Sequence, residues 1–162
     1  MDLVYVGKIV NTHGIKGELR ILSDFEKKDL VFKVGNKIII ENEEHTITSY
    51  RFHKVFDMIT IDNLNNINDV LKYVGKKVYV SRISLNLKKS EYLLSDLIGL
   101  NVVSNDTVYG IVKDYNNDIN PLLKIDYKKN YYIPLKANYI KKVDLENKQI
   151  IVQNIEGLII WK

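Results

Sequence analysis

Hydrophobic residues in the first half of the chain alternate with polar residues or gather in short β-branched runs, a pattern typical of β-strands. Such runs occupy residues 3–10, 18–22, 37–41, 46–52, 58–61 and 77–80. One stretch instead has helical spacing, with asparagines before it and a glycine after it, and its apolar residues are Ile67, Val70, Leu71 and Val74. Six short strands and one helix favour a closed or nearly closed β-barrel, because closure leaves no unpaired strand edge.

The second half of the chain returns to the strand pattern after a polar interruption at residues 84–90. Strands are expected at residues 100–103, 108–114, 122–127, 131–133, 140–145 and 149–152, with turn-forming residues between them. The final apolar segment, residues 155–161, fits either a short helix or an extended tail. The sequence therefore predicts an all-β protein with one domain at residues 1–84, a linker at residues 85–90 and a second domain at residues 91–162.

The composition is that of an ordinary folded protein, with 46% hydrophobic and 27% charged residues. The longest aliphatic runs are far too short to cross a bilayer, and no basic-then-apolar leader precedes the first strand. The absence of cysteine excludes a disulfide framework and thiolate chemistry. We therefore expect a cytoplasmic protein, with a monomer as the default state.

Charge is spread evenly along the chain. Residues 1–85 contain 13 Lys/Arg and 11 Asp/Glu, residues 86–162 contain 11 and 9, and the net charge is +4. Neither half has the dense positive charge of a protein held mainly by phosphate contacts.

The residues that usually carry catalysis or bind metals form no recognisable pattern. The three histidines, His13, His45 and His53, have no ligand-like spacing to one another or to carboxylates. No serine lies in a G-x-S-x-G context, and Gly7-Lys8 lacks the other residues of a phosphate-binding loop. We therefore expect no catalytic residue, no metal and no cofactor.

A polar turn near the start of the chain is the strongest candidate for a functional site. Gly14 and Gly17 lie three residues apart between two predicted strands, and His13, Lys16 and Arg20 surround them. The spacing matches a G-x-x-G loop that clamps RNA backbone, but that loop joins two helices, whereas both flanks here are predicted strands. Two interpretations stay open: a tight connection whose glycines serve geometry alone, or a loop that contacts a partner. For Arg20, a solvated strand face is the competing interpretation.

Several fragments, in order along nearly the whole chain, resemble the RimM family. They begin with residues 6–21 around the polar turn and continue with the following pieces of the second half: Glu91-Tyr92-Leu93-Leu94-Ser95-Asp96-Leu97-Ile98-Gly99-Leu100, Gly110-Ile111-Val112, Leu122-Leu123-Lys124-Ile125, Ile133-Pro134 and Glu156-Gly157-Leu158. The resemblance implies two β-barrels in tandem, an N-terminal RimM-type barrel of six strands and a C-terminal PRC-type barrel.

The resemblance also implies a function. RimM proteins assist assembly of the small ribosomal subunit and processing of its 16S rRNA. The expected partners are the head region of the immature subunit and the head ribosomal protein numbered nineteen, with contact to rRNA also possible. On this reading His13, Lys16 and Arg20 face the particle, and Tyr92 anchors the ribosomal protein, unless its ring packs between the barrels. The alternative is a β-barrel module that binds rRNA directly, without a ribosomal protein.

Two departures from the family pattern lie in the second domain. A paired aromatic motif is reduced to Tyr92-Leu93, and an asparagine-aspartate pair is replaced by Asn120-Pro121. Proline fixes φ and removes a backbone donor, so we expect a different loop shape there. The remaining motif residues are expected to shape turns or the start of the domain, and they are Asp96, Leu97, Gly99 and Pro134.

Overall fold

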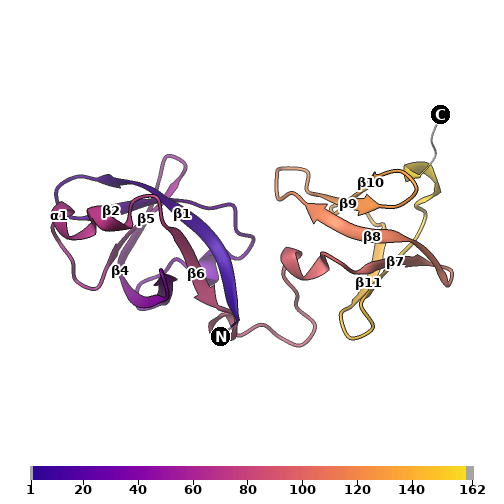
Figure 1. The fold of residues 1–162 in the computed structure, drawn as a ribbon, viewed down its shortest axis with the longest axis horizontal. Helices are drawn as coiled ribbons and strands as arrows, with labels where there is room; N and C mark the ends of the chain where they lie inside the picture. Colours follow the sequence, from indigo (N-terminus) through magenta and orange to yellow (C-terminus); the bar gives the residue numbers. More distant parts are fainter. Residues whose placement is uncertain (1, 160–162) are drawn as a thin grey trace. The chain divides into compact units, whose positions relative to one another are not determined.

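The computed structural model describes residues 2–159, which form two compact units that divide between Ser90 and Glu91 (Figure 1). Nearly all the regular structure in both units is β-strand, as the sequence predicts. The exact limits of the linker, residues 85–90, stay a prediction. Among the described residues, no helix has the length and apolar character needed to span a membrane.

The first unit is a closed barrel of antiparallel strands in the order β1-β2-β5-β4-β3-β6. The strands are β1 (Leu3–His13), β2 (Glu18–Leu22), β3 (Lys37–Ile40), β4 (Glu43–His53), β5 (Phe56–Ile61) and β6 (Lys77–Ser81). Strand β1 pairs with β6 through its first half and with β2 through its second, with a register shift in each pairing. Such bulges bend a strand, which lets β1 close the barrel. The predicted closed barrel is confirmed.

The core of this barrel is built from the inward-facing residues that alternate along its strands. Leu19 and Ile21 on β2 are fully buried, whereas the alternate residues Glu18, Arg20 and Leu22 are not. Other fully buried side chains of the barrel are Ile9, Ile38, Ile40, Ile47, Met58, Ile59 and Ile61. Because large aliphatic side chains each contribute about 1.5–3 kcal/mol when buried, these residues fix the register of the strands and the direction of the polar side chains between them.

The predicted helix is shorter than its apolar spacing indicates. Helix α1 (Ile67–Val70) is followed directly by a 3₁₀ turn at Leu71–Tyr73. Val70 and Tyr73 are buried, but Leu71 is 50% exposed, so its expected inward position is wrong. The physical reason is the change of pitch after Val70, because a 3₁₀ turn places residues three apart on one face and brings Tyr73 inward instead.

The second unit is a six-stranded sheet in the order β10-β9-β8-β7-β12-β11. Its strands are β7 (Asn101–Ser104), β8 (Thr107–Tyr115), β9 (Leu122–Asp126), β10 (Tyr131–Pro134), β11 (Ile140–Asp144) and β12 (Gln149–Val152). Strands β12 and β7 pair in parallel, and the other neighbours are antiparallel. The core contains Leu97, Leu100, Val102, Val112, Leu123, Ile125, Tyr131, Ile133, Ile150, Val152 and Ile155. A 3₁₀ turn at Glu156–Leu158 occupies part of the terminal segment, and residues 160–162 of that segment lie outside the described residues.

The start of the second unit is shaped by a local hydrogen-bonded turn. The Leu93 N–H donates to Asp96 Oδ2 at 2.8 Å, and the Asp96 N–H donates to the Leu93 carbonyl at 2.9 Å. Leu97 is fully buried, and Gly99 adopts φ +90° while its N–H donates to the Val112 carbonyl at 2.8 Å. Leu93 itself is fully buried, so this departure from the family pattern is a packing position rather than an exposed one.

Candidate functional site

The polar turn is the hairpin loop between β1 and β2. His13 and Glu18 are cross-strand partners at its base, and residues 14–17 form the loop itself. Strand β1 therefore continues three residues beyond the predicted end at Val10, because a register shift after Ile9 keeps residues 11–13 paired with β2. Both flanks are strands, as predicted, so the G-x-x-G spacing here belongs to a hairpin.

Position 17 requires glycine for two reasons: its backbone has a positive φ, and backbone atoms of another segment lie close to it. Its φ is +85°, and a Cβ at this position would lie 3.1 Å from the Leu64 carbonyl oxygen and 3.3 Å from backbone atoms of Asn66. On the same side, the Ile67 N–H donates to the Ile15 carbonyl at 2.9 Å. The loop is thus held against the segment before α1 and the first residue of α1, so its side chains have defined positions.

His13 and Arg20 form a hydrogen-bonded pair on the outer face of β1 and β2. Arg20 Nη2 lies 2.6 Å from His13 Nδ1, and the guanidinium lies over the Phe56 ring, 5.7 Å from its centroid. Because arginine always keeps its protons, Nη2 donates and Nδ1 accepts, so a neutral His13 carries its proton on Nε2. Arg20 Nε is buried and has no hydrogen-bond partner within the described structure. Arg20 is therefore partly covered and orients His13.

A second pair, Glu18 with Arg51, lies beside the first and was not predicted from the sequence. Arg51 donates two hydrogen bonds of 2.8 Å to the two carboxylate oxygens of Glu18. The hydrogen bond from Arg51 and the positive charge of Arg51 hold the pKa of Glu18 below its ordinary value, against the opposing effect of burial. Glu18 is therefore a carboxylate at neutral pH, with its charge balanced by Arg51.

This pair makes a testable prediction about the titration of Glu18. In Arg51→Gln we expect the pKa of Glu18 to rise toward its ordinary value, because the dominant hydrogen bond and the nearby charge are both lost. The stabilisation from the pair is present above the ordinary carboxyl pKa and is lost as the pH falls through the lowered one. NMR titration of the carboxyl carbons measures this. The lowered pKa of Asp144, which depends on Asn147, is the internal control and should not move. An unchanged Glu18 pKa would contradict the geometry.

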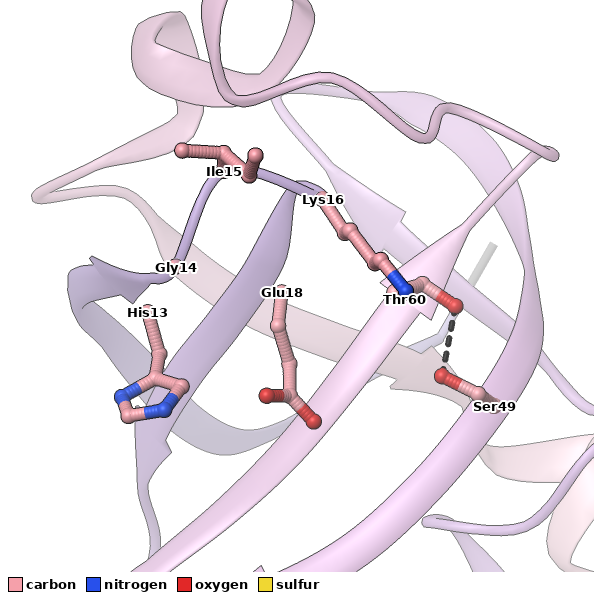
Figure 2. A pocket seen from close by; sticks show the side chains of 7 residues that line it. All are labelled: His13, Gly14, Ile15, Lys16, Glu18, Ser49 and Thr60. Carbon is pink, nitrogen blue, oxygen red and sulfur yellow. Dashed lines mark hydrogen bonds between the residues drawn. The ribbon is translucent and has the colours of Figure 1, made fainter.

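His13 and Glu18 border a pocket of about 430 Å³ beneath the β1–β2 loop (Figure 2). It is lined by His13, Gly14, Ile15, Lys16, Glu18, Ser49 and Thr60. The Thr60 hydroxyl on β5 is hydrogen-bonded to Ser49 Oγ at 2.6 Å and to Thr48 Oγ1 at 2.8 Å, both on β4. Figure 2 shows the Lys16 side chain reaching from the loop toward Thr60, with Glu18 between His13 and Ser49 in this view. The pocket is therefore lined by an ammonium group, an imidazole, a carboxylate and two hydroxyls.

The structure brings together only some of the residues singled out from the sequence. His13 and Lys16 line the pocket, and Arg20 supports it through His13. Ser49 and Thr60 could not be predicted from the sequence, because the pairing of β4 with β5, and of β5 with β2, brings them to the loop.

Tyr92 belongs to the other unit, where it is half-buried and packs against the core cluster of the second sheet. Asn120 is exposed, and the Pro121 carbonyl accepts a hydrogen bond of 2.9 Å from the Leu135 N–H. Pro134 lies in β10 at the edge of the sheet, where a missing N–H is tolerated. In the part of the chain that the structure describes, no three His, Cys, Asp or Glu side chains gather as a metal site.

Comparison with known proteins decides the family. One family model, the RimM N-terminal domain, matches residues 4–85, and a second, the RimM PRC barrel domain, matches residues 94–158. The chain belongs to the RimM family. The RimM-type first domain and the PRC-type second domain expected from the sequence are thereby confirmed.

Two RimM proteins resemble the chain over almost its whole length, and a solved N-terminal domain resembles part of it. The ribosome maturation factor RimM of Staphylococcus haemolyticus is 37% identical over 96% of this chain and 98% of its own. The protein of the same name from Staphylococcus aureus is 38% identical with the same coverage. The solution structure of the RimM N-terminal domain from Thermus thermophilus is 20% identical, covers 52% of this chain and 95% of that chain, and has a TM-score of 0.45. RimM proteins are ribosome maturation factors, so a role in ribosome maturation follows for this member.

Proposed function

We propose that this RimM protein binds the head region of the immature small ribosomal subunit through the head ribosomal protein numbered nineteen. It assists subunit assembly and processing of the small-subunit rRNA, and it acts in the cytoplasm as a monomer. The observation that carries this proposal is the match of both RimM domains, in order, to relatives named as ribosome maturation factors.

The proposed mechanism is binding without covalent catalysis. A factor that binds one conformation of an assembling particle more tightly than others shifts the population toward that conformation. Two rigid β-domains suit this task, because their loops present side chains in fixed positions. The modest net charge of +4 supports docking on a protein, since RNA-dominated binding requires many phosphate contacts and weakens steeply with salt.

In the first domain, the face toward the particle is the β1–β2 loop with His13, Lys16 and Arg20. Lys16 is exposed, and His13 lies at the pocket with its orientation set by Arg20. The exposed tip residue Ile15 adds apolar surface at the same place, with 80% of its surface accessible. A loop that combines an exposed aliphatic side chain with oriented polar groups is typical of a recognition surface.

In the second domain, Tyr92 is the proposed anchor for the ribosomal protein. Buried tyrosines at interface centres commonly contribute 2 kcal/mol or more, so Tyr92→Ala should weaken binding to that protein by about thirtyfold. Tyr92→Phe keeps the ring and should retain most of the affinity. Because Tyr92 packs against the core, thermal unfolding of both variants must accompany the titration. Full affinity in a folded Tyr92→Ala protein would remove Tyr92 from the interface.

Co-sedimentation tests the proposed function as a whole. The full-length protein is expected to sediment with free small subunits and to be absent from complete ribosomes, because an assembly factor must leave before the finished subunit translates. Equal association with complete ribosomes, or none with free subunits, would contradict the proposal.

A second candidate function is direct binding of rRNA without a ribosomal protein. The cation and hydroxyls of the first-domain pocket favour it. It predicts comparable affinity for naked rRNA and for the subunit, with a steep decrease as salt rises.

A further inference from the structure

We propose that the pocket beneath the β1–β2 loop binds one ribonucleotide of a single-stranded RNA segment. The proposal rests on the proposed function and deepens it, by assigning the first domain an RNA contact beside the docking of the second domain on a ribosomal protein. The pocket's lining comes from four strands, β1, β2, β4 and β5, and from loop residues 14–16, so its shape is set by the barrel itself.

The charges around the pocket favour an anion. Lys16 lines it, Arg20 is hydrogen-bonded to the lining residue His13, and Arg51 is hydrogen-bonded to the lining residue Glu18. The single carboxylate of this group, Glu18, already accepts two hydrogen bonds from Arg51. The group as a whole therefore carries an excess of positive charge, and the exposed ammonium of Lys16 is placed to meet a phosphate as a point charge.

The remaining polar groups favour a nucleotide over an acidic peptide. Glu18 can still accept further hydrogen bonds, because each carboxylate oxygen has more than one lone-pair site. A ribose 2′-hydroxyl or a base amine can donate to it, whereas a peptide carboxylate would be repelled. The Ser49 and Thr60 hydroxyls both donate and accept, and Nε2 of a neutral His13 is a donor. A ribonucleotide offers an anion, donors and acceptors together.

The size and rim of the pocket fit the same occupant. A volume of about 430 Å³ is within the range of small-molecule sites, about 300–1,000 Å³, and is much larger than a lone phosphate or carboxylate needs. His13 lies 6.0 Å from His53 between ring centroids, which adds a second imidazole beside the site. Imidazole rings are surfaces on which an unpaired base stacks, and the exposed side chain of Ile15 adds apolar surface at the rim.

The test is a titration of the full-length protein with a short unstructured RNA. Binding is monitored by the NMR chemical shifts of the pocket residues. Probes of the same length are the matching DNA, which lacks the 2′-hydroxyl, and an oligoglutamate peptide. The variants are Lys16→Ala and Thr60→Val, and the matched control is Lys8→Ala, an exposed lysine five residues before His13 on β1. Thermal unfolding shows whether each variant is folded.

RNA is expected to shift His13, Lys16 and Thr60 and to bind more tightly than the DNA. Lys16→Ala should weaken RNA binding about tenfold, as expected for the loss of one charge-assisted contact. It should also reduce the salt slope by about 0.7, the value for one single-strand phosphate. Thr60→Val should weaken binding with little change in that slope, and Lys8→Ala should leave both quantities unchanged.

The proposal is overturned if RNA shifts no pocket residue, if Lys16→Ala and Lys8→Ala have equal effects, or if oligoglutamate binds in preference to RNA. Co-sedimentation of the wild type and the same variants with free small subunits distinguishes failure of the nucleotide site from failure of the proposed function. Wild-type association with free small subunits together with no pocket response to RNA would refute the nucleotide site alone. If the wild-type protein does not associate with free small subunits, the proposed function is refuted.

Discussion

Gly110→Ala is expected to destabilise the second domain by about 3 kcal/mol or more, which is a large share of the stability of a small domain. Gly110 lies in β8 with φ +111°, where side chains are strained. A Cβ there would lie 2.5 Å from the Asp126 carbonyl oxygen and 2.9 Å from Ile125 Cγ2 on the neighbouring strand β9. Since the first of these atoms is backbone, the two strands would have to separate. Urea unfolding with hydrogen exchange of second-domain amides measures the loss.

Gly99→Ala is the matched control for this prediction. Gly99 also has positive φ, +90°, but nothing lies within 4 Å of an added Cβ. Its substitution is therefore expected to cost only about 1 kcal/mol of backbone strain. Equal losses in the two variants would show that backbone conformation, and not the close approach of β8 to β9, determines the effect. A stable Gly110→Ala protein would contradict the strand packing described above.

Asp57→Ala is expected to destabilise the first domain by about 2 kcal/mol, because the groups that lose their acceptor are partly exposed to water. Asp57 is buried in β5, with Oδ1 accepting a hydrogen bond of 2.7 Å from the Tyr50 hydroxyl and Oδ2 lying 2.7 Å from Lys28 Nζ. Burial, and then the hydrogen bond to Asp57, raise the pKa of Tyr50 to about 12. Alanine would leave the hydroxyl and the ammonium without their acceptor. Thermal unfolding, with far-UV circular dichroism, measures the change.

Two further variants separate the contributions at Asp57. Asp57→Asn keeps an acceptor for Tyr50 and loses the ion pair, so its destabilisation should be smaller than that of alanine. Asp29→Ala removes an exposed carboxylate of the same domain and should change stability by about 0.5 kcal/mol or less. If Asp57→Ala were as stable as Asp29→Ala, the contacts of Asp57 with Tyr50 and Lys28 would make no net contribution to folding.

The fold was largely predictable because each strand is short and has one buried face. Alternation such as Leu19 and Ile21 between Glu18, Arg20 and Leu22 specifies both the strand and its direction toward the core. The helix was predicted less well, because apolar spacing at Leu71 cannot show that the chain changes to a 3₁₀ turn after Val70. That turn buries Tyr73 in place of Leu71.

The site was predictable only where it is local in the sequence. His13, Lys16 and Arg20 lie within one hairpin, so their proximity follows from its two strands. Arg51 pairs with Glu18 from 33 residues away, and the pairing depends on β5 lying between β2 and β4. Strand order of this kind is set by closure of the barrel, and residue spacing does not contain it. Similarly, the burial of Leu93 depends on packing that a motif cannot show.

We propose that this RimM protein docks on a ribosomal protein rather than on bare RNA. The measurement is a titration of the full-length protein at two salt concentrations. One series uses the isolated head ribosomal protein numbered nineteen, and a parallel series uses naked small-subunit rRNA. We predict specific binding to the ribosomal protein that decreases little as salt rises, with much weaker binding to the rRNA. No binding to that protein, together with tight and strongly salt-sensitive binding to the rRNA, would show that the protein docks on RNA instead.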